Sequence, residues 1–242
     1  MFEYKKPGIS PDLAQLYDVC YSAGLLAQRH ALFTWLARLI RVQTGEKVLD
    51  VACGDAQFRP MLEAQGAHYV GIDFSRAAVA AAAYPQVLPA DAHALPFADQ
   101  TFDCLVNIGS LEHFADIELG IREMARVLKP SGWAYILMPN AFGLTWNILR
   151  VWHTGHIDLE DGQPVQRFGT RRAWQHLLEA SGLHVCQTYG YERNWPPTWH
   201  EWLHYGRAPR ELGLALLTPL IPLNLQRMFV FRCCTKVESC CR

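Results

Sequence analysis

Short runs of mainly apolar residues alternate with helical patterns through the middle of the chain. The apolar runs predict strands at residues 47–51, 69–72, 87–90, 102–106 and 133–138. Patterns at helical spacing lie between them, at residues 58–65, 75–83 and 117–128, and KPSG (residues 129–132) is expected to end the last helix. This alternation predicts parallel strands joined by crossovers, and strands without polar alternation predict a sheet covered on both faces.

The segments on either side of this core have different patterns. Residues 11–42 place Leu32, Leu36 and Ile40 at helical spacing, which predicts helices that cap the sheet. Residues 140–170 lose the regular pattern before a predicted helix at 171–180 and predicted strands at 184–189 and 228–233. We therefore expect a doubly wound α/β fold with an N-terminal helical cap over residues 1–45. The main domain is expected over residues 46–242, with substrate-facing insertions near 140–170 and 194–225.

Length and charge narrow the class of protein. A chain of 242 residues is long enough for one elaborated α/β domain with a sizeable core. Its 22 basic and 23 acidic side chains give a formal charge of −1 and form no basic stripe, so we expect no nucleic-acid partner.

The apolar stretch at 212–223 contains Pro219 and Pro222 and is too short to cross a bilayer. We expect a cytoplasmic protein without a signal peptide, and peripheral membrane contact through tryptophans stays open.

The cysteines do not form a recognisable metal site. The chain has 8 of them, without a CxxC pair, and the four near the C-terminus match known ligand spacings poorly. We therefore expect no bound metal.

The segment VLDVACGDAQF (residues 48–58) is the most informative part of the chain. An apolar strand reaches Asp50, and a turn with Gly54 leads into a predicted helix, whose free N–H groups favour ligand oxygens. The next predicted strand ends at Asp73, where doubly wound folds place the acid that binds a ribose diol. Both carboxylates are also good helix caps, which is the alternative interpretation.

Four segments in this order resemble the class I S-adenosylmethionine-dependent methyltransferases, specifically the small-molecule group. They are VLDVACGDA (48–56), VGIDFS (70–75), ADAHALPFADQTFDCLVNIGSLEHF (90–114) and REMARVLKPSGWAYILMPN (122–140). The resemblance implies S-adenosyl-L-methionine as cofactor and S-adenosyl-L-homocysteine as product. It also implies a seven-stranded, mostly parallel sheet with the last strand antiparallel and helices on both faces.

The resemblance assigns the methionine and ribose parts of the cofactor to two strand ends. The turn formed by Ala52, Cys53 and Gly54 would pass under the methionine part, and Asp50 would hold its amino group. Asp73 would accept both ribose hydroxyls, a pattern of charge-assisted hydrogen bonds worth roughly 1.5–3 kcal/mol each.

The resemblance also assigns the adenine and the reactive sulfur. Phe74 would pack on the adenine face, and Asp91 and Ala92 would recognise its amino group and ring nitrogen. Asn107 and Ile108, at the end of a predicted strand, would border the sulfonium.

One departure concerns two alanines, since the family commonly has glycine where this chain has Ala52 and Ala56. Alanine is tolerated at these positions where φ is negative, so the change weakens the motif without removing it.

Candidates for catalysis and for acceptor binding lie outside the cofactor motifs. His113 follows a strand near the expected acceptor, where it is either a general base or a structural residue of the pocket wall; Glu112 is the other acid–base candidate. Substrate contacts are expected from Tyr17, Tyr21, His30 and Trp146, although tyrosines at helical spacing also pack against the domain.

The resulting functional hypothesis is a methyltransferase acting on a small-molecule acceptor by in-line displacement. The aromatic insertions favour an apolar or sugar-like acceptor. Two alternatives remain: a binding module without turnover, and a nicotinamide-dependent oxidoreductase, which the lack of a full GxGxxG motif disfavours.

Overall fold

The computed structural model describes residues 1–5, 13–22, 30–156, 163, 165–192, 202, 213 and 216–236. Its strands are β1 (Phe2–Lys5), β2 (Lys47–Val51), β3 (His68–Asp73), β4 (Val87–Pro89), β5 (Phe102–Ile108), β6 (Leu128–Pro139), β7 (Val165–Phe168), β8 (His184–Tyr191) and β9 (Met228–Cys234). Its α-helices are α1 (Leu13–Ser22), α2 (His30–Leu39), α3 (Arg59–Glu63), α4 (Arg76–Ala82), α5 (Ile117–Val127), α6 (Leu149–Thr154) and α7 (Arg171–Ala180). Shorter turns are η1 (Leu111–His113), the π-helical η2 (Leu144–Ile148), η3 (Thr218–Leu220) and η4 (Leu223–Leu225).

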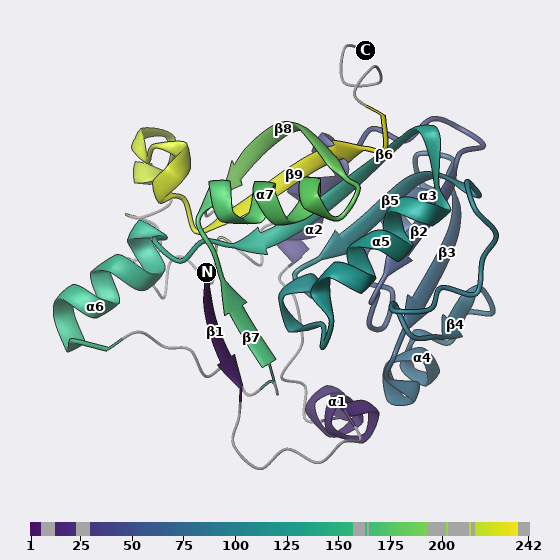
Figure 1. Cartoon of the computed structure of the whole chain (residues 1–242), viewed down its shortest axis with the longest axis horizontal. Helices are drawn as coiled ribbons and strands as arrows, with labels where there is room; N and C mark the ends of the chain where they lie inside the picture. Colours follow the sequence, from purple (N-terminus) through teal and green to yellow (C-terminus); the bar gives the residue numbers. More distant parts are fainter. Residues whose placement is uncertain are drawn as a thin grey trace.

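The main sheet has seven strands in the order β4-β3-β2-β5-β6-β9-β8 (Figure 1). The strands from β4 to β6 pair in parallel, and β9 is antiparallel to both of its neighbours. This confirms the predicted fold class, including the antiparallel last strand.

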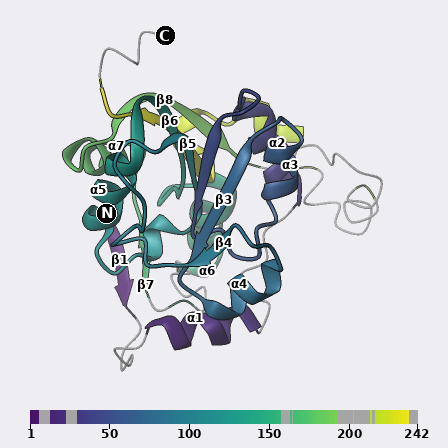
Figure 2. The same ribbon diagram turned by 90° about the vertical axis from the view of Figure 1, so that its right-hand side faces the viewer.

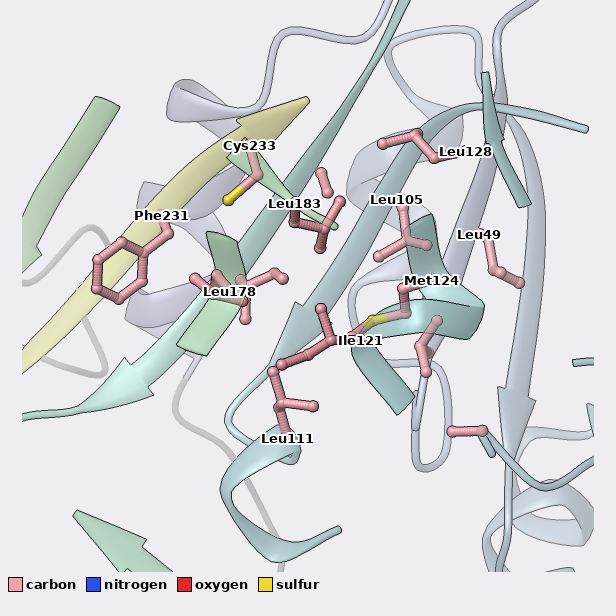
Figure 3. Close-up of a cluster of buried hydrophobic side chains, with 14 of the residues drawn as sticks. Leu49, Leu105, Leu111, Ile121, Met124, Leu128, Leu178, Leu183, Phe231 and Cys233 are labelled. Atoms are coloured by element: carbon pink, nitrogen blue, oxygen red, sulfur yellow. The ribbon is translucent and has the colours of Figure 1, made fainter. Parts of the chain in front are cut away.

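The helices cover both faces of this sheet. Figure 2 shows the strands between α5 and α7 on one side and α2 and α3 on the other. Alternate side chains of β2 enter different cores, because successive strand residues point to opposite faces. Leu49 belongs to the buried cluster that also contains side chains of α5 and α7 (Figure 3), whereas Val48 belongs to the cluster that contains side chains of α2 and α3.

Three helices begin at side chains that cap them. The oxygens of Ser75, Asp116 and Thr170 accept hydrogen bonds from backbone N–H groups in the first turns of α4, α5 and α7. Such caps stabilise a helix by about 1 kcal/mol each. Ser75 comes two residues after the end of β3, so this cap anchors the chain just beyond the carboxyl end of that strand.

Helix α5 ends at Val127, just before KPSG, as predicted, but β6 begins at Leu128, earlier than the predicted strand at 133–138, so KPSG lies inside β6. The pairing of β5 with β6 shifts register between Phe102 and Cys104, so residues 129–132 face Asp103. Lys129 Nζ lies 2.6 Å from Asp103 Oδ1. A Cβ on Gly132 would lie 2.7 Å from the Asp103 carbonyl oxygen, so glycine is needed at this bulge.

The N-terminal cap and the insertions also differ from expectation. The cap is not purely helical, because β1 pairs antiparallel with β7, and Arg167 Nε lies 2.7 Å from Glu3 Oε2. Within residues 11–42, the structure has two helices, α1 and α2, with residues 23–29 outside the described part. Most of the insertion expected at 194–225 also lies outside it. None of the described helices has the length and apolar character needed to span a bilayer.

Candidate functional site

A cavity of about 780 Å³ lies where β2, β3, β5 and β6 reach their carboxyl ends. Open α/β sheets bind ligands at this edge, and the volume lies within the range of small-molecule sites. The sequence-predicted residues that line it are Tyr17, Asp50, Ala52, Cys53, Gly54, Asp73, Phe74, Asp91, Ala92, Ile108, His113 and Trp146. The fold therefore gathers side chains from distant parts of the chain around one space.

The turn after β2 is built from left-handed backbone. Ala52 has φ 58°, Gly54 has φ 58° and Ala56 has φ 60°. The negative φ under which alanine would be tolerated is therefore found at neither alanine. Left-handed backbone costs a residue with a Cβ roughly 1–2 kcal/mol, because the Cβ approaches the following carbonyl oxygen. The turn keeps the shape that glycines would give it and is strained at the two alanines.

We expect Ala52→Gly to raise the free energy of unfolding by about 0.5–1 kcal/mol, since glycine relieves this strain. Ala56→Gly should be nearly neutral, because Ala56 is buried and loses a packed methyl worth about 0.8 kcal/mol. Ala83, which is exposed at φ 48°, is the matched control outside the cavity, and Ala83→Gly should stabilise like Ala52→Gly. Urea unfolding measures all three; a destabilised Ala52→Gly protein with a stabilised Ala83→Gly protein would contradict the assignment of strain.

Asp73 is held firmly at the end of β3. Its Oδ2 accepts a hydrogen bond from the Gly54 N–H at 2.8 Å, and its Oδ1 accepts one from the Ser75 N–H at 2.8 Å. Burial raises its pKa, and these backbone bonds oppose the rise. Each carboxylate oxygen has a second lone pair, so the group can still accept hydrogen bonds from a ligand diol.

Asp50 is buried one strand away. Its Oδ2 accepts a hydrogen bond from the Tyr69 hydroxyl at 3.0 Å. Burial raises the pKa of Asp50 to about 7; the Tyr69 bond opposes this rise, and the charge of Asp73 adds to it. Burial also raises the pKa of Cys53, which keeps its thiol protonated. A cationic group placed beside Asp50 and Asp73 would favour their ionised forms.

The expected adenine end lies beyond β3. Phe74 is 40% exposed although it lines the cavity, which leaves a ring face accessible to a ligand. The Asp91 carboxylate accepts a hydrogen bond from the His93 N–H at 2.9 Å, and His93 Nδ1 lies 2.6 Å from Asp91 Oδ1. These interactions with His93 orient the Asp91 carboxylate.

Two adjacent residues at the end of β5 have different positions. Ile108 lines the cavity, as expected. Asn107 is fully buried and does not line it: its Nδ2 donates to the Val51 carbonyl and to Ser110 Oγ, and its Oδ1 accepts from the Leu111 N–H. The expectation that Asn107 borders the ligand is therefore corrected, since its side chain joins β5 to β2 and η1.

His113 lies in η1, in the cavity wall. Its Nδ1 donates to the Val165 carbonyl at 2.7 Å, so the other nitrogen, Nε2, accepts from the Gln163 amide at 2.8 Å. Glu112 is buried beside it, with Oε1 3.9 Å from His113 Nε2, rather than solvated. The basic nitrogen of His113 therefore points at a side chain that a ligand hydroxyl could replace.

The expected substrate contacts are only partly described. Tyr17 lines the cavity from α1, and its neighbour Asp18 accepts hydrogen bonds from the Ser75 hydroxyl and the Ala77 N–H, which lower the pKa of Asp18. These bonds dock α1 on the start of α4. The side chains of Tyr21 and His30 lie outside the described residues.

Several cavity residues were not anticipated from the sequence. Gln163 and Gln166 come from the segment of β7, and Arg227 and Met228 come from the start of β9. No motif marks them, and only the pairing of β9 with β6 brings Arg227 to this edge. No cluster of His, Cys, Asp or Glu suited to a metal ion occurs among the residues that the structure describes.

Comparison with known proteins gives a consistent picture. Residues 49–136 match the family model described as a methyltransferase domain. A demethylmenaquinone methyltransferase of Corynebacterium efficiens is 35% identical over 123 residues, which are 50% of this chain and 54% of that protein. The chain thus spans about half the length of the curated relatives it matches.

Solved structures resemble nearly the whole chain. The cyclase SpnF has a TM-score of 0.64 at 21% identity, covering 93% of this chain and 96% of that one. A Burkholderia thailandensis 1,6-didemethyltoxoflavin-N1-methyltransferase, with 1,6-didemethyltoxoflavin and S-adenosylhomocysteine bound, has a TM-score of 0.62 at 14% identity. That match covers 96% of this chain and 93% of the other. At these identities the likeness shows the fold, and the reaction has to be argued from the site.

Proposed function

We propose that the chain, whose residues 49–136 match the model of a methyltransferase domain, is an S-adenosylmethionine-dependent enzyme that methylates a small molecule. The observation that carries the proposal is the placement of Asp50 and Asp73 on neighbouring strands, both facing one cavity. These two hydrogen-bond-accepting carboxylates suit a nucleoside with a ribose diol and a cationic tail. The proposal would fail if the cavity bound no such nucleoside.

In this proposal the chain holds the cofactor along the edge of the sheet. Asp73 accepts hydrogen bonds from the ribose hydroxyls, and Asp50 pairs with the amino group of the methionine part, above the turn of Ala52, Cys53 and Gly54. Phe74 packs on the adenine, whose polar edge faces Asp91 and Ala92. These assignments extend the sequence-based expectations, and the shared cavity supports them.

The chemistry requires placement more than it requires an acid or base. Bound S-adenosylmethionine supplies a methyl group on a positively charged sulfur. The protein holds the acceptor in line with that methyl, and such orientation contributes roughly 7–11 kcal/mol in favourable cases. In this proposal Ile108, which lines the cavity at the end of β5, borders the reacting centre.

His113 is the proposed general base where the acceptor is a hydroxyl. Its Nε2 carries the lone pair, because its Nδ1 N–H is engaged by the Val165 carbonyl. An acceptor hydroxyl in the position of the Gln163 amide would reach Nε2 and pass its proton there. General-base catalysis of this kind contributes about 100- to 10,000-fold.

Calorimetric titration of S-adenosylmethionine into the protein tests the proposal directly. We expect saturable binding and, with a cell extract as acceptor source, transfer of label from the methyl group. Binding without transfer would favour the non-catalytic module. Absence of binding by the folded protein, together with a fluorescence change on adding NADH, would favour the oxidoreductase.

The raised pKa of Asp50 predicts a specific pH dependence. Below pH 7 Asp50 is protonated and cannot neutralise the cofactor amino group, so affinity should rise about tenfold per pH unit up to about pH 7 and level off above about pH 8. Because the folded pKa exceeds 3.8, the unliganded protein should also lose stability as the pH rises toward 7.

Dissociation constants between about pH 5.5 and about pH 8.5 measure this effect. Asp50→Asn should bind more weakly and with a flatter profile. A wild-type profile that is flat over this interval would contradict the assignment of Asp50.

The acceptor class is a further part of the proposal. The demethylmenaquinone methyltransferase and the 1,6-didemethyltoxoflavin-N1-methyltransferase are named for small-molecule acceptors, which supports a small-molecule acceptor for this chain. The net charge of −1 supports such an acceptor over a nucleic acid. The cytoplasmic location stays a prediction.

A further inference from the structure

The cavity is lined by several acids and, next to the start of β9, by a cation. Asp50, Asp55, Asp73 and Asp91 line it at the ends of β2 to β4, Glu112 lines it from η1, and Arg227 lines it next to the start of β9. Arg227 is the one lysine or arginine among the described lining residues. Strand spacing puts β9 roughly 19 Å from β3 and roughly 10 Å from β5, so Arg227 lies far from the acids that suit the cofactor.

Arg227 is fixed in this position by its neighbours. Its backbone N–H donates to Glu192 Oε2 at 2.7 Å, and its carbonyl oxygen accepts from the Asn140 N–H at 3.0 Å. Its guanidinium carbon lies 4.2 Å from the centre of the Trp146 ring. A guanidinium stacked by its face keeps its N–H groups in the plane, where they form paired hydrogen bonds with a carboxylate.

Trp146 is itself held by local structure. It lies in the π-helical turn η2, where the buried side-chain amide of Asn147 donates to the carbonyls of Asn140 at 3.0 Å and Ala141 at 3.1 Å. Its ring meets Phe168 edge to face, with centroids 5.7 Å apart. Single π-helical turns occur frequently at functional sites, and this one presents an aromatic surface beside the cation.

A second observation shows that the same cavity offers an unsatisfied hydrogen-bond acceptor to a polar ligand. Gln166 lines the cavity from β7 and is 3% exposed, and its Oε1 has no hydrogen-bond partner among the described residues. A buried carbonyl oxygen without a donor is costly, and such groups in native structures generally have a partner. A donor on a bound molecule would satisfy it.

We propose that the acceptor is a flat aromatic molecule with one anionic group, which Arg227 binds at the end of the cavity remote from Asp73. The inference rests on the proposed function, since it names the substrate class of that site. The ring lies against the apolar walls near Trp146 and Met228, and a hydrogen-bond donor on the molecule reaches Gln166. The anionic group is then roughly 10 Å from the end of β5, so it orients the acceptor without meeting the reacting atom.

A pair of ligands that differ only in charge tests this proposal. Binding of 2-naphthoate and of its neutral counterpart 2-naphthamide is measured by calorimetry on protein saturated with S-adenosylhomocysteine. We expect the naphthoate to bind about 10- to 100-fold more tightly, as charged hydrogen bonds would give. In Arg227→Gln the two affinities should become equal.

Two further variants keep the result interpretable. Arg227→Lys retains the charge without the planar fork and should show an intermediate preference for the naphthoate. Arg122→Gln removes an exposed arginine that pairs with Glu118 outside the cavity, and it should bind like the wild type. Equal affinities in the wild type, no binding of either ligand, or a naphthoate preference that survives in Arg227→Gln would overturn the proposal.

S-adenosylhomocysteine binding is measured first and by itself. If Arg227→Gln weakens that binding tenfold or more and leaves the naphthoate preference intact, Arg227 belongs to the cofactor site and the inference is wrong. If the wild type does not bind S-adenosylhomocysteine, the proposed function fails instead. The two failures are therefore distinguishable.

Discussion

Replacement of Asp73 by alanine is expected to weaken S-adenosylmethionine binding about 100- to 10,000-fold. The proposed bonds are two charge-assisted hydrogen bonds from the ribose hydroxyls, at about 1.5–3 kcal/mol each. The carboxylate is rigidly placed, because both oxygens already accept backbone N–H groups, from Gly54 and Ser75. Little ordering entropy therefore opposes ligand binding at this position. Calorimetric titration measures the loss.

The same backbone bonds give Asp73 a structural role that has to be separated from binding. Thermal unfolding of Asp73→Ala identifies any general loss of fold. Asp99→Ala removes an exposed carboxylate that pairs with Arg126 away from the cavity, and it should leave cofactor affinity unchanged. A folded Asp73→Ala protein that binds S-adenosylmethionine within a few-fold of the wild type would disprove the assignment.

Trp174→Ala should lower the free energy of unfolding by about 3–5 kcal/mol, the usual cost of removing a fully buried aromatic side chain. For a domain of this size the melting temperature should fall by about 6–20 °C. Trp174 also forms part of the support for the cavity: its Nε1 donates to the carbonyl of Pro139, a lining residue, at 2.8 Å. A Cβ on Gly169 would lie 2.8 Å from its ring, so chain and ring are tightly packed here.

Trp174→Phe separates packing from the hydrogen bond. Phenylalanine fills most of the space and leaves the Pro139 carbonyl without this donor, so a loss of about 1–3 kcal/mol is expected. Differential scanning calorimetry compares the variants. Equal stabilities of wild type and Trp174→Ala would show that the contact between α7 and the end of β6 is not important for the fold.

Most of the sheet could be predicted because its signals are local. The apolar runs that form β2, β3, β5, β6 and β9 need no knowledge of their partners, and their alternation with helices implies parallel pairing. The turn after β2 was located because Gly54 and the strand-end acids lie close together in sequence. The strand boundaries read from the sequence therefore predict which residues lie at this edge of the sheet.

Other features depended on contacts between distant segments. β1 pairs with β7, which follows it by more than half of the chain, and nothing in residues 2–5 specifies that partner. KPSG follows the end of α5, as the sequence predicts, but it also lies within β6. There Lys129 contacts Asp103, at an irregularity in the pairing of β5 with β6. The conformation of Ala52 and Ala56 also follows from the surrounding structure, which holds them at a positive φ that alanine itself disfavours.

The sequence by itself determined the class of fold and the two acids at the proposed cofactor edge, because periodicity and strand ends are properties of adjacent residues. Only the tertiary structure decided which side chains form the opposite end of the cavity. Trp146 was expected to contact substrate, but Arg227 and Gln166 were not, and the three residues line one cavity from separate segments. Their meeting depends on how β9 and β7 are placed against β6, which long-range pairing sets and no local pattern encodes.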